Sequence, residues 1–192
     1  MNKSLKEVLE LFDESAQTII KSKSIAKDIL PVIEAIINCL TRGNKIVLFG
    51  NGGSAADAQH MAAEIIGRYL IERKSLPAIA LTTDSSILTA LGNDYGFNDV
   101  FSRQCESLVK NGDIVIAIST SGKSENIIQG IKTAKKNGAI IIALTGGNGG
   151  KLKSITDHII IIPSRKTPRI QEGHRIVIHT ICELTEKYFA KQ

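Results

Sequence analysis

Residues 113–124 read DIVIAISTSGKS, an apolar run that leads directly into a cluster of hydroxyl side chains. Residues 45–54 read KIVLFGNGGS and repeat this order, with a glycine-rich loop after the apolar run. Runs that are apolar on both faces are typical of parallel strands buried between two layers of helices, because a sheet with one exposed face would alternate polar with apolar residues. These two stretches therefore predict an α/β fold.

The chain has three more runs of the same kind, and segments with helical periodicity lie between the runs. The predicted strands are Lys45 to Phe49, Pro77 to Leu81, Asp113 to Ile118, Ala139 to Leu144 and His158 to Ile162. We expect a three-layer α/β/α sandwich with a five-stranded parallel sheet. In such a fold ligands bind beyond the carboxyl ends of the strands, so the loops after the strands are the candidate sites.

The first 40 residues carry apolar residues at three- and four-residue steps, which predicts helix. Pro31 is expected to bend or split this stretch. So long an amphipathic helix exceeds what one sheet face needs, so we expect residues 1–40 to pack between subunits, with an intramolecular helical layer as the alternative. Residues 44–192 would form the sandwich, and residues 1–192 a single domain.

Composition narrows the class of protein. The chain has 192 residues, 43% of them hydrophobic, which is enough for one core without disulfide or metal staples. No leader sequence and no apolar run of about 18 residues is seen, so we expect a cytoplasmic protein that does not contact membranes. The net charge of +5 is scattered and aromatic residues are only 4%. A small anionic substrate explains this charge as well as nucleic acid would, and we expect no nucleic acid partner.

The three cysteines are few and widely spaced. Cys39, Cys105 and Cys182 match neither a disulfide framework nor a CxxC metal site, so we expect buried free thiols.

The two loops are suited to an anionic sugar. After Gly50–Ser54 we expect a helix from Ala55 to Leu70. The unpaired backbone N–H groups and the dipole at its start favour an anion or sugar oxygens, although a plain strand-to-helix turn is the alternative. The loop Ser119–Ser124 offers four hydroxyls at another helix start and predicts a phosphate cradle, with a simple serine-rich cap as the alternative. Because Ala117 stands where a nucleotide P-loop requires glycine, we expect the phosphate of a small molecule.

Two helices carry further candidate side chains. Asp57, His60, Glu64 and Arg68 form a polar stripe on the helix after the glycine loop. His60 and Glu64 are four residues apart and can present an imidazole and a carboxylate to one point, although an ordinary helix-face pair has the same spacing. On the last helix His174 falls on the apolar seam and is expected to be a packing residue. Gln171 and His179 lie off that seam, and His179 alone is consistent with either a surface pair or a functional group.

Taken together, these segments resemble the sugar isomerase (SIS) family, and the resemblance covers essentially the whole chain. The matching segments are Gly50–Ser54 with Asp57, His60 and Glu64; Gly92–Phe97; Phe101–Gln104; Ile118–Gly122 with Ser124; and Arg169–Glu172 with His179. The resemblance implies a ketose–aldose isomerase that converts D-sedoheptulose 7-phosphate to D-glycero-D-manno-heptose 7-phosphate, for heptose of bacterial surface polysaccharides. It also implies a homotetramer with active sites at subunit contacts.

The resemblance also implies a set of site residues. One zinc ion per subunit would be bound by the residues matching His60, Glu64, Gln171 and His179. The substrate would be held by Asn51, Gly52, Gly53, Ser54, Glu64, Asn93, Asp94, Ser119, Thr120, Ser121, Ser124 and Gln171.

The implied reaction moves a carbonyl between two carbons through an enediolate, so it needs a base, an acid and a group that stabilises a negative oxygen. Glu64 is the candidate base and His179 the acid. A carboxylate held tightly by zinc is a poorer base, so Glu64 cannot fill both roles at full strength unless coordination loosens.

Helix geometry constrains the implied zinc site. On a continuous helix Gln171 and His179 would be separated by about 12 Å of rise and about 80° of rotation. We therefore expect either a distorted helix near Gly173, which should loosen the helix locally, or a site that takes one of the two residues from a neighbouring subunit.

Other functions have the same fold. A non-enzymatic SIS-domain binding protein of the DnaA initiator-associating type is the main alternative, and it would have a protein partner and no turnover. Isomerases of arabinose 5-phosphate or hexulose 6-phosphate are a third group. A sugar-sensing transcription regulator is disfavoured, because residues 1–40 lack a convincing helix-turn-helix.

Overall fold

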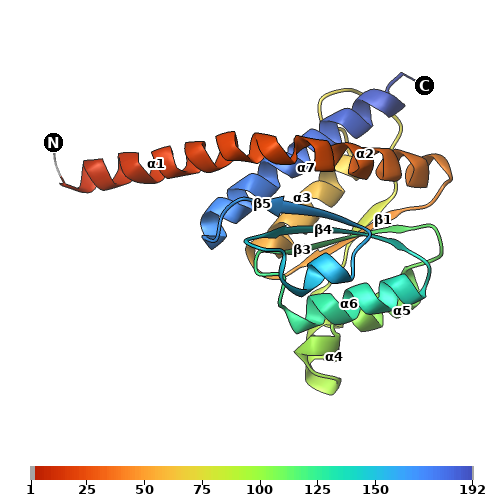
Figure 1. Cartoon of the computed structure of the whole chain (residues 1–192). Coiled ribbons are helices and arrows are strands. Elements are labelled where there is room, and N and C mark those ends of the chain that lie inside the picture. The colour runs from red at the N-terminus through yellow and green to blue at the C-terminus, as the bar shows by residue number, and fades with distance from the viewer. Residues whose placement is uncertain (1–2, 192) are drawn as a thin grey trace.

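The structure, a computed structural model, describes residues 3–191. Within that range it has one parallel sheet of five strands in the order β2-β1-β3-β4-β5 (Figure 1). The strands are β1 (Ile46–Gly50), β2 (Ala78–Ala80), β3 (Ile114–Ser119), β4 (Ile140–Gly146) and β5 (His158–Ile162). Their register pairs Ile46 with both Ala78 and Ile114, and Ile114 with Ile140. The predicted five-stranded parallel sheet is confirmed, and the bounds of all five strands lie within two residues of the predicted ones.

Helices cover both faces of the sheet, so the predicted three-layer sandwich is confirmed (Figure 1). Successive strand residues point to opposite faces, and each face has its own core: Leu48 and Ile116 belong to one, Val47 and Val115 to the other. The first core is closed by α2 (Ala26–Thr41), α3 (Gly53–Ile66) and α7 (Thr167–Phe189), and the second by α5 (Ser102–Leu108) and α6 (Glu125–Lys136).

The strand order reverses its direction between β1 and β3. From β1 the chain moves outward to β2, and it returns to β3 on the other side of β1. The two connections diverge at this point, which is where open α/β sheets bind ligands. The glycine loop and the serine loop both start here. The side-chain amides of Asn51 and Asn126 join them through two reciprocal hydrogen bonds of 2.9 Å.

The N-terminal helical stretch breaks where the sequence did not predict it. α1 (Lys3–Lys21) is followed by a 3-10 turn, η1 (Ser22–Ile25), and α2 then runs through Pro31 without splitting. Of the two predicted effects of Pro31, a bend or a split, the split is therefore wrong. The hydroxyls of Ser22 and Ser24 in η1 donate to backbone carbonyls four and three residues earlier, those of Thr18 and Lys21. Such bonds from serine to the preceding turn often bend helices.

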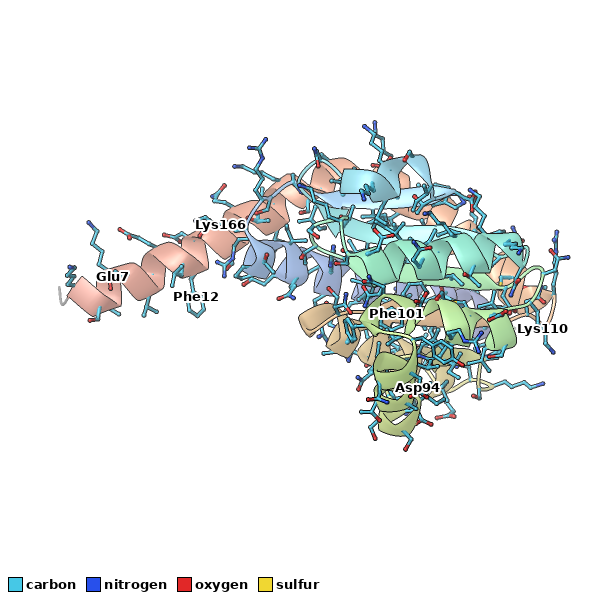
Figure 2. The ribbon with its side chains drawn as sticks, turned by 90° about the horizontal axis from the view of Figure 1, so that it is seen from below. Glu7, Phe12, Asp94, Phe101, Lys110 and Lys166 are labelled. Atoms are coloured by element: carbon cyan, nitrogen blue, oxygen red, sulfur yellow. The ribbon has the colours of Figure 1, made fainter. Side chains whose placement is uncertain are left out.

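α1 extends away from the body of the chain, whereas α2 is packed against the sheet (Figures 1 and 2). The C-terminal half of α1 is fastened to the start of α7: Arg169 Nη1 donates to the Leu11 carbonyl at 2.6 Å, and Lys166 pairs with Glu14 at 2.6 Å. Large apolar side chains along α1 remain exposed, and Figure 2 shows Phe12 standing off the helix, 72% exposed. The exposed apolar residues of α1 are Leu5, Val8, Leu9, Leu11, Phe12 and Ile20.

α4 (Ser85–Asp94) also projects from the body and has no buried residue (Figure 1). Two further 3-10 turns are η2 (Phe97–Asp99) and η3 (Gly150–Ser154). No helix within residues 3–191 is both long enough and apolar enough to cross a membrane.

All three cysteines are buried free thiols, as predicted. Burial raises the pKa of Cys39 to about 11 and the pKa values of Cys105 and Cys182 to about 12, so none is poised as a nucleophile at neutral pH.

Candidate active site

The glycine loop has a shape that only glycines allow. A Cβ on Gly50 would stand 2.6 Å from the Ser54 carbonyl oxygen, because the chain folds back tightly there. Gly52 has a φ of +56°, which suits glycine, and it caps the start of α3. The amide of Gln171 occupies the space where a side chain on Gly53 would stand. The loop therefore presents its backbone, and Gln171 of α7 lies directly on it.

The serine loop leaves hydroxyl groups available to a ligand. Ser124 is the N-cap of α6, but its hydroxyl makes no capping bond to that helix. Ser121 Oγ accepts one bond, from the Lys123 backbone N–H at 3.2 Å. A hollow of about 240 Å³ adjoins the loop. Its lining contains two cationic residues and no acidic one: Thr120, Ser121, Lys123, Gly146, Gly147, Asn148, Arg165 and Ile170.

We call the glycine loop, the serine loop and Gln171 together the loop half-site, defined by residues 50–54, residues 119–124 and Gln171. A hollow of about 450 Å³ beside it includes Gly53, Gln171 and the ion pair between Asp57 and Arg175, whose charged atoms are 2.7 Å apart. Burial raises the pKa of Asp57, and the neighbouring Arg175 guanidinium offsets this only in part.

Three further candidate residues meet elsewhere on α3 and α7, and we call His60, Glu64 and His179 the helix half-site. His60 Nε2 lies 2.9 Å from His179 Nε2, and 3.6 Å from Glu64 Oε1. The rings of Tyr69 and His179 are 5.7 Å apart, centre to centre. Burial, and then the positive charge of Arg175, lower the pKa of His60 and favour its neutral form. At 2.9 Å one ring nitrogen donates and the other accepts, so the pair requires at least one neutral imidazole.

The structure does not bring Gln171 to the helix half-site. α7 is one unbroken helix through Gly173, so the predicted distortion there is absent. Gln171 contacts the glycine loop near the start of α3, whereas His179 contacts His60 two turns further along α3. Within residues 3–191 no group of three or more His, Cys, Asp or Glu side chains has the arrangement of a metal centre. Of the two predicted arrangements, the distorted helix is therefore wrong, and a site shared between copies of the chain stays a prediction.

Asn93 and Asp94 lie apart from both half-sites. They are exposed at the end of α4, where the Asn93 amide donates to the Asp94 carboxylate at 2.8 Å. Figure 2 shows Asp94 at the projecting end of the molecule, beyond the helices that cover the sheet. In the part of the chain that the structure describes, neither residue bonds to the loop or helix half-site.

Sequence reasoning missed three residues that shape the site. Asn126 fixes Asn51, Arg175 neutralises Asp57, and Tyr69 packs on His179. The position of Arg175 four residues after Gln171 puts both on one helix face and could have identified it. The other two depend on contacts between distant segments.

Comparison with known proteins agrees with this geometry. The SIS domain family matches residues 11–146. Phosphoheptose isomerase from Aquifex aeolicus (strain VF5) is 54% identical over 184 residues, covering 95% of this chain and 96% of that protein. The solved phosphoheptose isomerase structure from Neisseria gonorrhoeae has a TM-score of 0.92 at 41% identity, covering 96% of this chain and 100% of that one. The structure from Francisella tularensis has a TM-score of 0.93 at 36% identity, with coverage of 96% and 99%. The chain therefore belongs to the SIS domain family and, within it, to the phosphoheptose isomerases.

Proposed function

We propose that this protein interconverts D-sedoheptulose 7-phosphate and D-glycero-D-manno-heptose 7-phosphate in the cytoplasm, on a route to bacterial surface polysaccharide. The observation that carries the proposal is the helix half-site, where the His60 imidazole lies 2.9 Å from the imidazole of His179 and 3.6 Å from the carboxylate of Glu64. Membership of the phosphoheptose isomerases supports the same reaction, and it favours an enzyme over a binding protein of the DnaA initiator-associating type.

The loop half-site is suited to the phosphate and the hydroxyl groups of such a sugar. Backbone N–H groups at the starts of α3 and α6 and the hydroxyls of the serine loop favour a phosphate dianion. We assign substrate binding to residues Asn51, Gly52, Gly53, Ser54, Ser119, Thr120, Ser121, Ser124 and Gln171, with Asn93 and Asp94 reaching the substrate from another copy of the chain.

The isomerisation requires a proton to leave one carbon and return to its neighbour. In the proposed mechanism Glu64 removes the proton, and the same carboxylate can deliver it to the adjacent carbon. His179 donates to the substrate oxygen that becomes negative in the enediolate, and His60 holds His179 in place through its 2.9 Å contact.

The donor types of the helix half-site are ones that zinc prefers, although within residues 3–191 of one chain they do not form the arrangement of a metal centre. Imidazole nitrogen and carboxylate oxygen are common zinc ligands, and neutral imidazole is the form that binds metal. We propose that His60, Glu64 and His179 would hold one ion, with Gln171 of a neighbouring copy as the fourth ligand, and that Glu64 acts as the base when its coordination loosens during turnover. A bound zinc ion would act as a Lewis acid that stabilises negative charge on the substrate oxygens.

We propose a homotetramer in which the loop half-site of one chain meets the helix half-site of another. Two features support this arrangement. Gln171 and His179 lie on one unbroken helix, about 12 Å of rise and about 80° of rotation apart, which does not suit one ion within one chain. The apolar side chains of α1 are exposed, which is unusual for a protein that functions as a monomer.

The test is a coupled assay with sedoheptulose 7-phosphate on the parent protein and on Glu64→Gln. Removal of the base should lower kcat at least about a hundredfold, because proton transfer by a positioned group contributes on the order of 10²- to 10⁴-fold. A chelator should also lower the rate, and added zinc should restore it. Glu106→Gln, an exposed glutamate on α5, is the matched control and should match the parent.

Turnover by Glu64→Gln at the parent rate would overturn the assignment of the base. An inactive but folded parent would instead support the binding-protein alternative.

A further inference from the structure

A buried carboxylate near the C-terminal end of α7 binds a loop through its backbone. Glu186 is 1% exposed. Its Oε1 accepts the N–H of Tyr69 at 2.6 Å, and its Oε2 accepts the N–H groups of Leu70 at 2.6 Å and Ile71 at 2.9 Å. Three consecutive backbone donors therefore point at one side chain, which fixes the turn they belong to.

The charge of Glu186 is balanced by Arg73, which is also buried, with 2% of its side chain exposed. Arg73 Nε lies 3.6 Å from Glu186 Oε1. Its other guanidinium nitrogens donate to carbonyls, Nη1 to Lys74 at 3.0 Å and Nη2 to Glu64 at 2.9 Å. Burial alone would raise the pKa of Glu186, but the three N–H donors and the Arg73 charge outweigh it and lower the pKa.

Both residues of this pair act on the helix half-site. The carbonyl of Glu64 lies in the last turn of α3, where it lacks a helical partner, and Arg73 supplies one. Tyr69, held by Glu186, places its ring 5.7 Å from the ring of His179. One buried ion pair thus fixes the backbone of the proposed base and the ring that packs on the proposed acid.

We propose that Glu186 and Arg73 are positioning residues that set the relative placement of Glu64 and His179. The proposal rests on the proposed function for its meaning in catalysis, but the placement itself can be measured without turnover. Residues 67–77 have no helix or strand of their own. Without the pair, this segment would lose the buried contacts that hold it against α3 and α7.

The test uses Glu186→Gln, which keeps the size of the side chain but removes the charge and one acceptor oxygen. The kcat should fall about tenfold to a hundredfold, because displacing reacting groups by about 1 Å costs rates of this order. The KM should stay within about twofold, since the substrate-binding groups lie in the loop half-site.

Asp113→Asn is the matched control. Asp113 is also a buried carboxylate, 2% exposed, and it accepts two backbone N–H groups, of Lys45 and Lys110, and the Lys45 ammonium. It lies at the amino end of β3, away from both half-sites. The control should lose stability as Glu186→Gln does, but it should keep the parent kcat.

Imidazole NMR signals of the metal-free protein give a readout that does not depend on activity. The signals of His60 and His179 should shift in Glu186→Gln, while the signal of His174, buried earlier on the same helix, should stay in place. Arg73→Lys provides a second variant if Glu186→Gln does not fold, and it should move the same two signals, because it loses the bond to the Glu64 carbonyl.

Unchanged His60 and His179 signals in both variants would overturn the proposal, as would equal losses of kcat in Glu186→Gln and Asp113→Asn. If the parent shows no turnover, the isomerase proposal fails, and the imidazole signals still decide whether the pair positions these residues.

Discussion

Gly173 shows how one missing side chain sets the position of the last helix. A Cβ at this position would stand 2.7 Å from Cγ2 of Ile162, a buried residue of β5. The low helix propensity of glycine led us to expect that Gly173 loosens the helix, but α7 runs through it unbroken. It allows α7 to lie close against the sheet, and this closeness supports the approach of Gln171 to the glycine loop.

Gly173→Ala should lower the free energy of unfolding by about 1–2 kcal/mol, because overpacking exceeds the gain of about 1 kcal/mol in helix propensity. Urea unfolding followed by circular dichroism measures the change. Gly92→Ala is the control, since an added Cβ meets nothing within 4 Å in α4, and it should be neutral or slightly stabilising. Equal losses in the two variants would contradict this account.

At the scale of elements, the strands were predictable and one helix end was not. The five strands are apolar on both faces in the sequence, and β1, β3 and β4 end at glycine or serine, so the pattern that predicts them is local. The helix after the glycine loop was expected to reach Leu70, but α3 ends at Ile66. The backbone N–H groups of residues 69–71 bind Glu186 instead, and a contact with a residue more than 100 positions away leaves no local pattern.

α7 also contains a buried titratable residue whose effect depends on pH. His174 is fully buried, and its Nε2 contacts the Thr145 carbonyl at 3.1 Å, as expected of a packing residue. Burial lowers the pKa of His174 from 6.5 to about 4. Between these values the unfolded chain binds a proton that the folded chain does not, so stability rises with pH across this window and falls on acidification.

Lowering the pH from 7 to 5 should therefore cost the parent about 2 kcal/mol more than it costs His174→Gln. Urea unfolding at both pH values measures the difference. His158→Gln, at the partly exposed start of β5, serves as the control and should retain the parent's pH dependence. If His174→Gln and the parent show the same pH dependence, His174 binds protons equally in the folded and the unfolded chain, and this account is wrong.

At the scale of the whole molecule, the sequence identified the candidate residues better than it placed them. Helix geometry alone indicated that Gln171 and His179 could share an ion within one chain only if the last helix were distorted, and α7 is one unbroken helix. The contact between Gln171 and Gly53 could not be foreseen, because it depends on how α7 crosses α3. The exposed position of Asn93 and Asp94 on α4 likewise follows from tertiary structure.

The separation of the two half-sites has a consequence for mixtures of defective chains. If every catalytic centre combines parts of two chains, a Gln171→Ala chain and a Glu64→Gln chain carry their lesions in different parts. Refolded together in equal amounts, they would form hybrid particles in which about one centre in four receives both intact parts. Two preparations that are each inactive would then recover about a quarter of the parent rate after co-refolding, which the coupled assay would measure. Simple mixing of the folded proteins provides the baseline, and no recovery after co-refolding would mean that each chain builds its centre alone.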